Sequence, residues 1–157
     1  MEDFAKLEKG DQIPQFDALT QSGQAFSNQS IVGKKTIFFF FPAAGSPGCT
    51  MESVEFNNEL EAFESGGFQV VGVSPDSVVK LAEFQDRHGL NYTFLSDESF
   101  AVHKAFGAYG NKSLYGKLYR GVLRSTIVID ENGQVILPLY NVKATGHVAM
   151  LLRKLGL

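Results

Sequence analysis

The strongest nucleophile that this sequence offers is its single cysteine, Cys49. It follows a short loop that leaves the apolar segment 34–41, and Pro47 just before it is typical of the first turn of a helix. The free N–H groups and the positive dipole end of a helix N-terminus favour an anion there, and a thiolate is such an anion. Cys49 is therefore the candidate centre for thiol chemistry.

A lone cysteine is, in general, more often a small buried residue of a hydrophobic core than a reactive group. Around Cys49, however, the neighbours Ser46, Thr50 and Glu52 are polar and do not form a core stripe. This context favours a reactive thiol and leaves the inert one as the alternative. With one cysteine the chain has no internal disulfide and no Cys-x-x-Cys motif, so thioredoxin-type disulfide exchange is excluded.

Three other side chains could support a thiolate. Arg124 stands at the start of a second apolar segment, and a guanidinium stays charged and offers several donors in a fixed fork. Taken alone, Arg124 is better explained as a solvated residue at a strand edge. Ser46 alone is an ordinary helix cap, and Glu52 alone is an acid that the helix dipole favours. None of the three side chains indicates a site by itself.

No metal or cofactor site is predicted. The three histidines, His88, His103 and His147, do not lie at metal-ligand spacing, and His147 is expected at the start of the last helix. The segment 107–113 only superficially suggests a phosphate loop, because its spacing does not match the Gly-x4-Gly-Lys-Ser/Thr pattern.

Hydrophobic patterning predicts the elements that would hold these residues in place. The run 34–41 is apolar on both faces, as in a central strand covered from both sides. Further strands are expected at 16–19, 25–26, 68–73, 92–95, 125–130 and 134–140, helices at 47–64, 76–88, 99–106 and 145–155, and a loop with some strand at 107–121. This alternation indicates a three-layer α/β/α sandwich with a mixed sheet, and 157 residues suit a single domain over 1–157.

Charge and hydropathy exclude several classes of partner. The chain has 14 Lys+Arg against 17 Asp+Glu, interspersed, so nucleic acid and anionic membranes are poor partners. Its longest apolar run is far shorter than the roughly 20 residues of a membrane span. The N-terminal segment is too acidic and polar for a secretory signal, and a single free thiol suits a reducing cytoplasm.

The segment around Cys49 resembles a known signature. Pro42, three residues, Ser46, two residues and Cys49 look like the peroxidatic motif of peroxiredoxins, and Ser-Pro-Gly-Cys-Thr followed by Glu52 is similar to the PrxQ group, also called bacterioferritin comigratory proteins. Further matches run in order along nearly the whole chain, at 73–77, 95–97, 115–117, 124–130, 142–143 and 146–147. The resemblance implies a thioredoxin-like fold.

The resemblance also implies a role for each matching residue. Cys49 would attack a peroxide oxygen and become a sulfenic acid. Ser46 would bind and orient the peroxide, and Pro42 would shield the thiolate. Arg124 would lie beside the sulfur, and Glu52 would hold Arg124 in place.

Neighbouring groups are expected to complete the site. The N–H groups of Gly48 and Cys49 would meet the charge that develops on oxygen, as the resemblance implies. Pro47 suits the first helical position. Phe40 and Phe41 are expected chiefly in the core, with a share in lining the pocket.

A second cysteine is missing where the resemblance would place one. Many PrxQ-like proteins carry a resolving cysteine five residues after the first, where this chain has Val54, and others carry it around Phe84 and Gln85. The sequence therefore predicts a one-cysteine peroxidase without metal, haem or flavin. It would reduce hydrogen peroxide and small organic hydroperoxides, and an external thiol (thioredoxin, glutaredoxin, glutathione or Cys49 of another copy) would recycle it.

Other interpretations stay open at this point. The resolving cysteine could have been engineered away. A noncatalytic peroxide sensor or binding module that uses reversible Cys49 oxidation is the rival function. The expected state is a monomer or weak homodimer.

Overall fold

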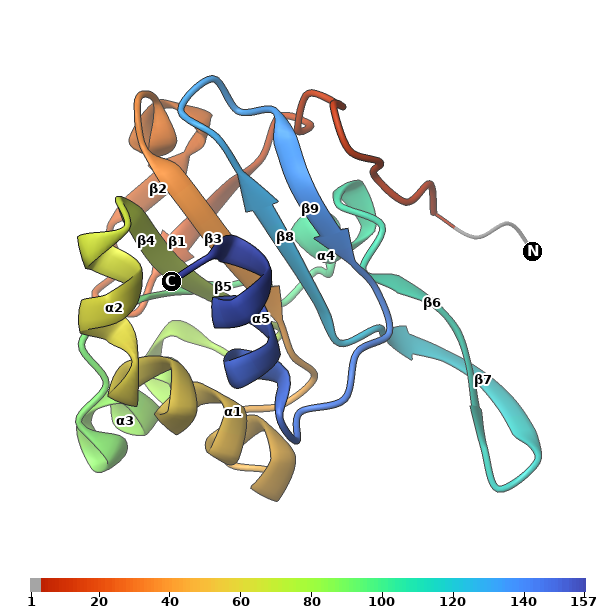
Figure 1. The fold of residues 1–157 in the computed structure, drawn as a ribbon. Coiled ribbons are helices and arrows are strands. Elements are labelled where there is room, and N and C mark those ends of the chain that lie inside the picture. Colours follow the sequence, from red (N-terminus) through yellow and green to blue (C-terminus); the bar gives the residue numbers. More distant parts are fainter. Residues whose placement is uncertain (1–3) are drawn as a thin grey trace.

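A mixed sheet forms the middle layer of the computed structural model, which describes residues 4–157 (Figure 1). Within that part of the chain, seven strands lie in the order β2-β1-β5-β4-β3-β8-β9. They are β1 (Asp17–Thr20), β2 (Ala25–Ser27), β3 (Lys35–Phe40), β4 (Phe68–Ser74), β5 (Thr93–Ser96), β8 (Ser125–Ile129) and β9 (Val135–Leu139). β3, β4 and β5 are mutually parallel, and the other pairs are antiparallel, so the sheet is mixed as predicted.

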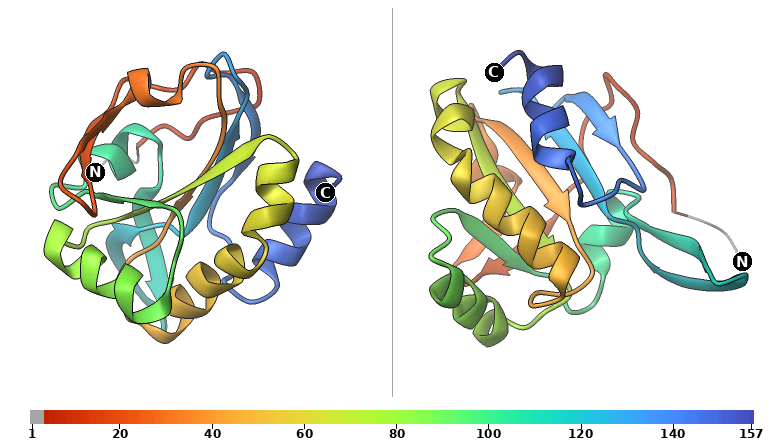
Figure 2. Two further views of the ribbon diagram at one scale, coloured as in Figure 1. Left: turned by 90° about the vertical axis from the view of Figure 1, so that its left-hand side faces the viewer. Right: turned by 60° about the horizontal axis from the view of Figure 1, so that its bottom comes forward.

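Helices cover both faces of this sheet (Figure 2). One face carries α1 (Pro47–Asn58), α2 (Leu60–Ser65), α3 (Val78–His88) and α5 (His147–Leu155), and the other carries α4 (Ala101–Ala105) and the short 3-10 helix η1 (Asn28–Ile31). In β3, Ile37 and Phe39 point into the first layer, whereas Phe38 and Phe40 point into the second. All four are fully buried, which confirms that this strand is covered from both sides.

Two of the predicted elements were wrong in their extent. The helix expected over 47–64 is divided, because Glu59 leaves the helical path between α1 and α2. Asn57 and Asn58 precede the break and are poor helix formers. The Asn57 side chain instead binds the backbone after α3, donating to the Gly89 carbonyl at 3.2 Å and accepting from the Asn91 amide at 2.7 Å.

The segment expected as a loop with some strand is a β-hairpin. It consists of β6 (Tyr109–Leu114) and β7 (Lys117–Val122), and it extends away from the sandwich (Figure 1). Much of it is exposed, with Tyr115 and Leu118 at 95% and 78%. Because neither face of the hairpin packs on a core along most of its length, apolar and polar residues alternate only weakly in its sequence.

Strand pairing explains how distant residues reach one site. β3 and β8 are antiparallel neighbours, and Phe40 at the end of β3 lies opposite Ser125 at the start of β8. The loop that follows β3 and the residue that precedes β8 therefore lie at the same edge of the sheet. This edge carries Cys49, in the first turn of α1, and Arg124.

Candidate active site

The sulfur of Cys49 lies in contact with the guanidinium of Arg124. Arg124 Nη2 donates to Cys49 Sγ over 3.2 Å, although 75 residues separate the two in sequence. Cys49 is fully buried and belongs to the same core cluster as Phe41 and Ala44, whereas 17% of the Arg124 side chain is exposed. The thiol is thus enclosed by hydrocarbon on some sides and faces a cation on another.

Glu52 holds the other branch of that guanidinium. Arg124 Nη1 donates to Glu52 Oε1 at 2.6 Å, and Glu52, one turn after Cys49 on α1, is fully buried. Its second oxygen, Oε2, has no hydrogen-bond partner among the described residues. One arginine therefore bridges the carboxylate and the sulfur, which fixes the guanidinium plane against Cys49.

The ionisable groups in this cluster shift one another's pKa values. Burial raises the pKa of Glu52 from 4.5 to about 7, and the neighbouring Arg124 offsets only part of that effect. Although burial opposes its charged form, the pKa of Arg124 is raised further by Glu52 and Cys49. The guanidinium therefore stays a cation under all working conditions.

The loop between β3 and α1 places the remaining predicted residues. Pro47 is the first residue of α1, as predicted, and Ser46 is the residue at its N-cap. The Ser46 hydroxyl does not cap the helix, however, because it donates back to the Ala43 carbonyl at 3.0 Å. A Cβ atom built on Gly48 would lie 3.6 Å from Arg124 Nη2, so the Gly48 backbone passes beside the guanidinium.

The residues at the end of β3 divide between the two faces of the sheet. Phe41 is fully buried in the cluster that contains Cys49, and Pro42 after it is half-buried. Phe40 packs in the opposite cluster, so the expectation that it lines the pocket was wrong. Successive residues of a strand point to opposite faces, which is why only one of the two phenylalanines reaches this side.

His147 is a neighbour of the site that the sequence did not reveal. It begins α5, as predicted, but it is also buried, and its Nε2 lies 2.7 Å from Thr126 Oγ1 on β8. Burial, together with the charge of Arg124, lowers the pKa of His147 to about 4. The imidazole is therefore neutral near pH 7, and its Nδ1 has no partner among the described residues.

The described residues form neither a metal cluster nor a helix that could span a membrane. Within residues 4–157, no three His, Cys, Asp or Glu side chains come together as a metal site would require. No helix in that part of the chain is long and apolar enough to cross a membrane.

Removing the Glu52 charge is expected to flatten the pH dependence of stability. The unfolded chain loses the Glu52 proton near pH 4.5 but the folded chain keeps it to about pH 7, so stability falls as the pH rises between these values. The loss amounts to about 3 kcal/mol. The free energy of unfolding of Glu52→Gln, measured with urea, should therefore rise by about that much relative to that of the unaltered protein between pH 5 and pH 8. Parallel stability profiles for the two proteins would rule this out.

Comparison with known proteins places this geometry in a family. The family model described as AhpC/TSA family matches residues 9–137. A protein of Mycobacterium tuberculosis H37Rv named as a peroxiredoxin is 46% identical over 151 residues, which cover 96% of each chain. Peroxiredoxin Bcp of Escherichia coli K12 is 33% identical over 141 residues, 90% of each chain.

Solved structures agree with the sequence relatives. The bacterioferritin comigratory protein of Xanthomonas campestris superimposes with a TM-score of 0.84 at 30% identity, over 90% of each chain. This likeness confirms the predicted thioredoxin-like α/β fold. With one cysteine in its sequence, the chain belongs to the AhpC/TSA family, as a one-cysteine member of the PrxQ (Bcp) group of peroxiredoxins.

Proposed function

We propose that this protein is a thiol-dependent peroxidase in which Cys49 is the peroxidatic residue. The observation that carries the proposal is the bridge from Glu52 through Arg124 to the Cys49 sulfur. It places a permanent cation, with one branch of its donors bound to Glu52 and the other directed at the sulfur, beside the one thiol of the chain. A buried structural cysteine has no need of such a partner.

The proposed reaction is a displacement on oxygen. The Cys49 thiolate attacks the near oxygen of the hydroperoxide, an S–O bond forms, and the O–O bond breaks. Cys49 becomes a sulfenic acid, and the leaving oxygen takes a proton to give water or an alcohol. Arg124 and the first-turn N–H groups of Gly48 and Cys49, which have no partner within the helix, would stabilise the charge on the leaving oxygen.

Recycling requires thiols from outside the chain. A first thiol attacks the sulfenic acid, releases water and forms a mixed disulfide with Cys49, and a second thiol then releases the reduced protein. Thioredoxin, a glutaredoxin, glutathione or Cys49 of another copy could serve, in a reducing cytoplasm and with the protein as a monomer or weak homodimer. The full burial of Cys49 favours hydrogen peroxide or a small organic hydroperoxide as substrate. The related Xanthomonas campestris protein is described for alkyl peroxide reduction.

Turnover separates this function from that of a noncatalytic sensor. With dithiothreitol as the thiol, the protein is expected to consume many equivalents of hydrogen peroxide per Cys49. Consumption that stops near one equivalent while dithiothreitol is still in excess would contradict the proposal and favour a sensor.

A cysteine at position 54 is expected to restore an internal resolving step. Val54 is half-buried on α1, five residues after Cys49. Five residues of intact helix advance about 7.5 Å along its axis, which is too far for a disulfide, so α1 must unwind locally. Peroxide-treated Val54→Cys should lose the mass of two hydrogen atoms and resist overoxidation. Formation of sulfenic or sulfinic acid alone, seen by mass spectrometry, would count against it.

A further inference from the structure

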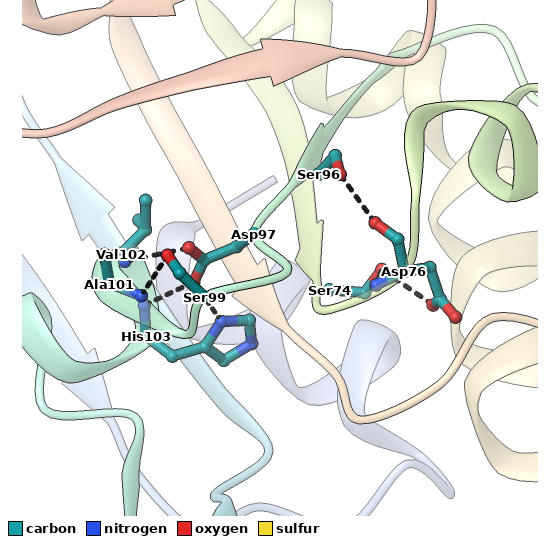
Figure 3. A network of polar contacts seen from close by, with 8 residues as sticks. All are labelled: Ser74, Asp76, Ser96, Asp97, Ser99, Ala101, Val102 and His103. Atoms are coloured by element: carbon teal, nitrogen blue, oxygen red, sulfur yellow. Dashed lines mark hydrogen bonds and ion pairs between the residues drawn. The ribbon is translucent and has the colours of Figure 1, made fainter.

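Two buried aspartates follow the parallel strands at the edge that carries the site, and they bind different parts of the fold (Figure 3). Asp76 comes after β4, and Asp97 comes after β5. Both are at most 9% exposed. Buried carboxylates are costly unless several donors satisfy them, so the donors show what each one stabilises.

Asp76 binds the loop that leads to Cys49. Its Oδ2 accepts the backbone N–H of Ala44 at 2.7 Å and the hydroxyl of Ser74 at 2.8 Å, while Lys80 lies 3.1 Å from Oδ1. The backbone of Asp76 is fixed as well, because its carbonyl accepts the Ser96 hydroxyl at 2.7 Å. The carboxylate is therefore a rigid anchor for Ala44.

The anchored N–H belongs to the same peptide group as the carbonyl that receives Ser46. The Ala43 carbonyl accepts the Ser46 hydroxyl at 3.0 Å and the Ser46 amide at 3.3 Å. A carboxylate on one side of a peptide group polarises it, so the carbonyl on the other side becomes a stronger acceptor. Asp76 and Ser46 are thus linked through one peptide plane.

We infer that Asp76 is a positioning residue for peroxide reduction: it fixes the Ala43–Ala44 peptide and, through it, the direction of the Ser46 hydroxyl. The single hydroxyl hydrogen of Ser46 is committed to Ala43, so the oxygen presents its lone pairs. Ser46 then accepts the O–H of an incoming hydroperoxide, while Arg124 acts as the donor. This inference rests on the proposed function of Cys49.

Asp97 provides a matched control. Its oxygens accept the amides of Val102 at 3.1 Å and His103 at 2.8 Å, and Oδ2 lies 2.6 Å from His103 Nδ1. These bonds hold α4, on the face of the sheet away from Cys49. Burial acts to raise the pKa of Asp97, but the hydrogen bonds from the His103 side chain and from the two amides outweigh it, so the pKa is lowered. Asp97 thus equals Asp76 as a buried carboxylate but does not bind the loop.

The test is a double-mutant cycle on the second-order rate constant for hydrogen peroxide. Asp76→Ala should lower it by about 10- to 100-fold, the range expected when a charged hydrogen bond is lost. Asp76→Asn can keep both bonds of Oδ2 through its amide oxygen, without the charge, and should lose only about threefold. In a Ser46→Ala background, Asp76→Ala should cost little more, because both changes remove the same interaction. Asp97→Asn should leave the rate constant within about twofold of the normal value. Its small effect should be the same with and without Ser46→Ala.

Each result is decisive. A normal rate constant in Asp76→Ala would overturn the inference. So would a double variant whose loss equals the product of the losses in Asp76→Ala and Ser46→Ala. If Asp76→Ala does not fold, the same cycle with Asp76→Asn applies, and independence of Asp76→Asn and Ser46→Ala would overturn it. Failure of the proposed function appears separately, as a slow reaction of the unaltered protein.

Discussion

Replacing Arg124 by lysine is expected to lower the rate constant for the reaction with hydrogen peroxide by about 100-fold or more, while the protein stays folded. The loss of one preorganised donor to a developing oxyanion costs about that much. Lysine keeps the positive charge but not the fork. In the structure the two branches of Arg124 serve different partners, Nη1 binding Glu52 and Nη2 the Cys49 sulfur. One ammonium group cannot reproduce both contacts in the same plane.

This substitution separates charge from geometry. Full ionisation of an ordinary thiol at neutral pH gains only about 10- to 30-fold in rate, whereas enzymes accelerate reactions by about a millionfold or more. Arg153→Lys, the same change at an exposed position of α5, is the control and should react at the normal rate. Stopped-flow rate constants for Arg124→Lys equal to those of the unaltered protein would show that the charge alone suffices.

Replacing Cys49 by serine is expected to abolish peroxide reduction, to the level of the buffer. A serine hydroxyl does not ionise at neutral pH, and the chain of 157 residues contains no other thiol that could substitute. The two side chains are close in size, and Arg124 can donate to a hydroxyl as it does to the sulfur. The variant should therefore fold normally.

The assay for this variant is peroxide consumption with excess dithiothreitol, with circular dichroism as the check of folding. A folded Cys49→Ser protein that still consumes peroxide above the buffer rate would place the activity elsewhere in the molecule. Such a result would also remove the significance of the Arg124 contact.

Much of the site was predictable because its key residues are tied to strong local signals. Pro47 marked a helix start, the apolar run 34–41 marked a buried central strand, and Cys49 fell at their junction. Residue types alone could not bring Arg124 to this place. Its position depends on the antiparallel pairing of β3 with β8, which are far apart in sequence, and only the family resemblance indicated it.

Details that depend on tertiary contacts were not predictable. The break at Glu59 goes with bonds between Asn57 and the segment after α3. The Ser46 hydroxyl turned to Ala43 although the residue type also suits a helix cap. The pair of His147 and Thr126 joins a helix to a strand 21 residues away in sequence, and neither residue type predicts contact with the other. In each case a contact that the residue types do not predict selects one of several arrangements that the local sequence suits about equally.

The most direct test is the rate at which reduced protein reacts with hydrogen peroxide in a single turnover, compared with free cysteine under the same conditions. Cys49 is fully buried, so burial without catalysis would make it slower than the free thiol. A site in which Arg124 and the first-turn amides stabilise the leaving oxygen should make it at least about a thousandfold faster, with Cys49 sulfenic acid as the product. A rate at or below that of free cysteine would contradict the account.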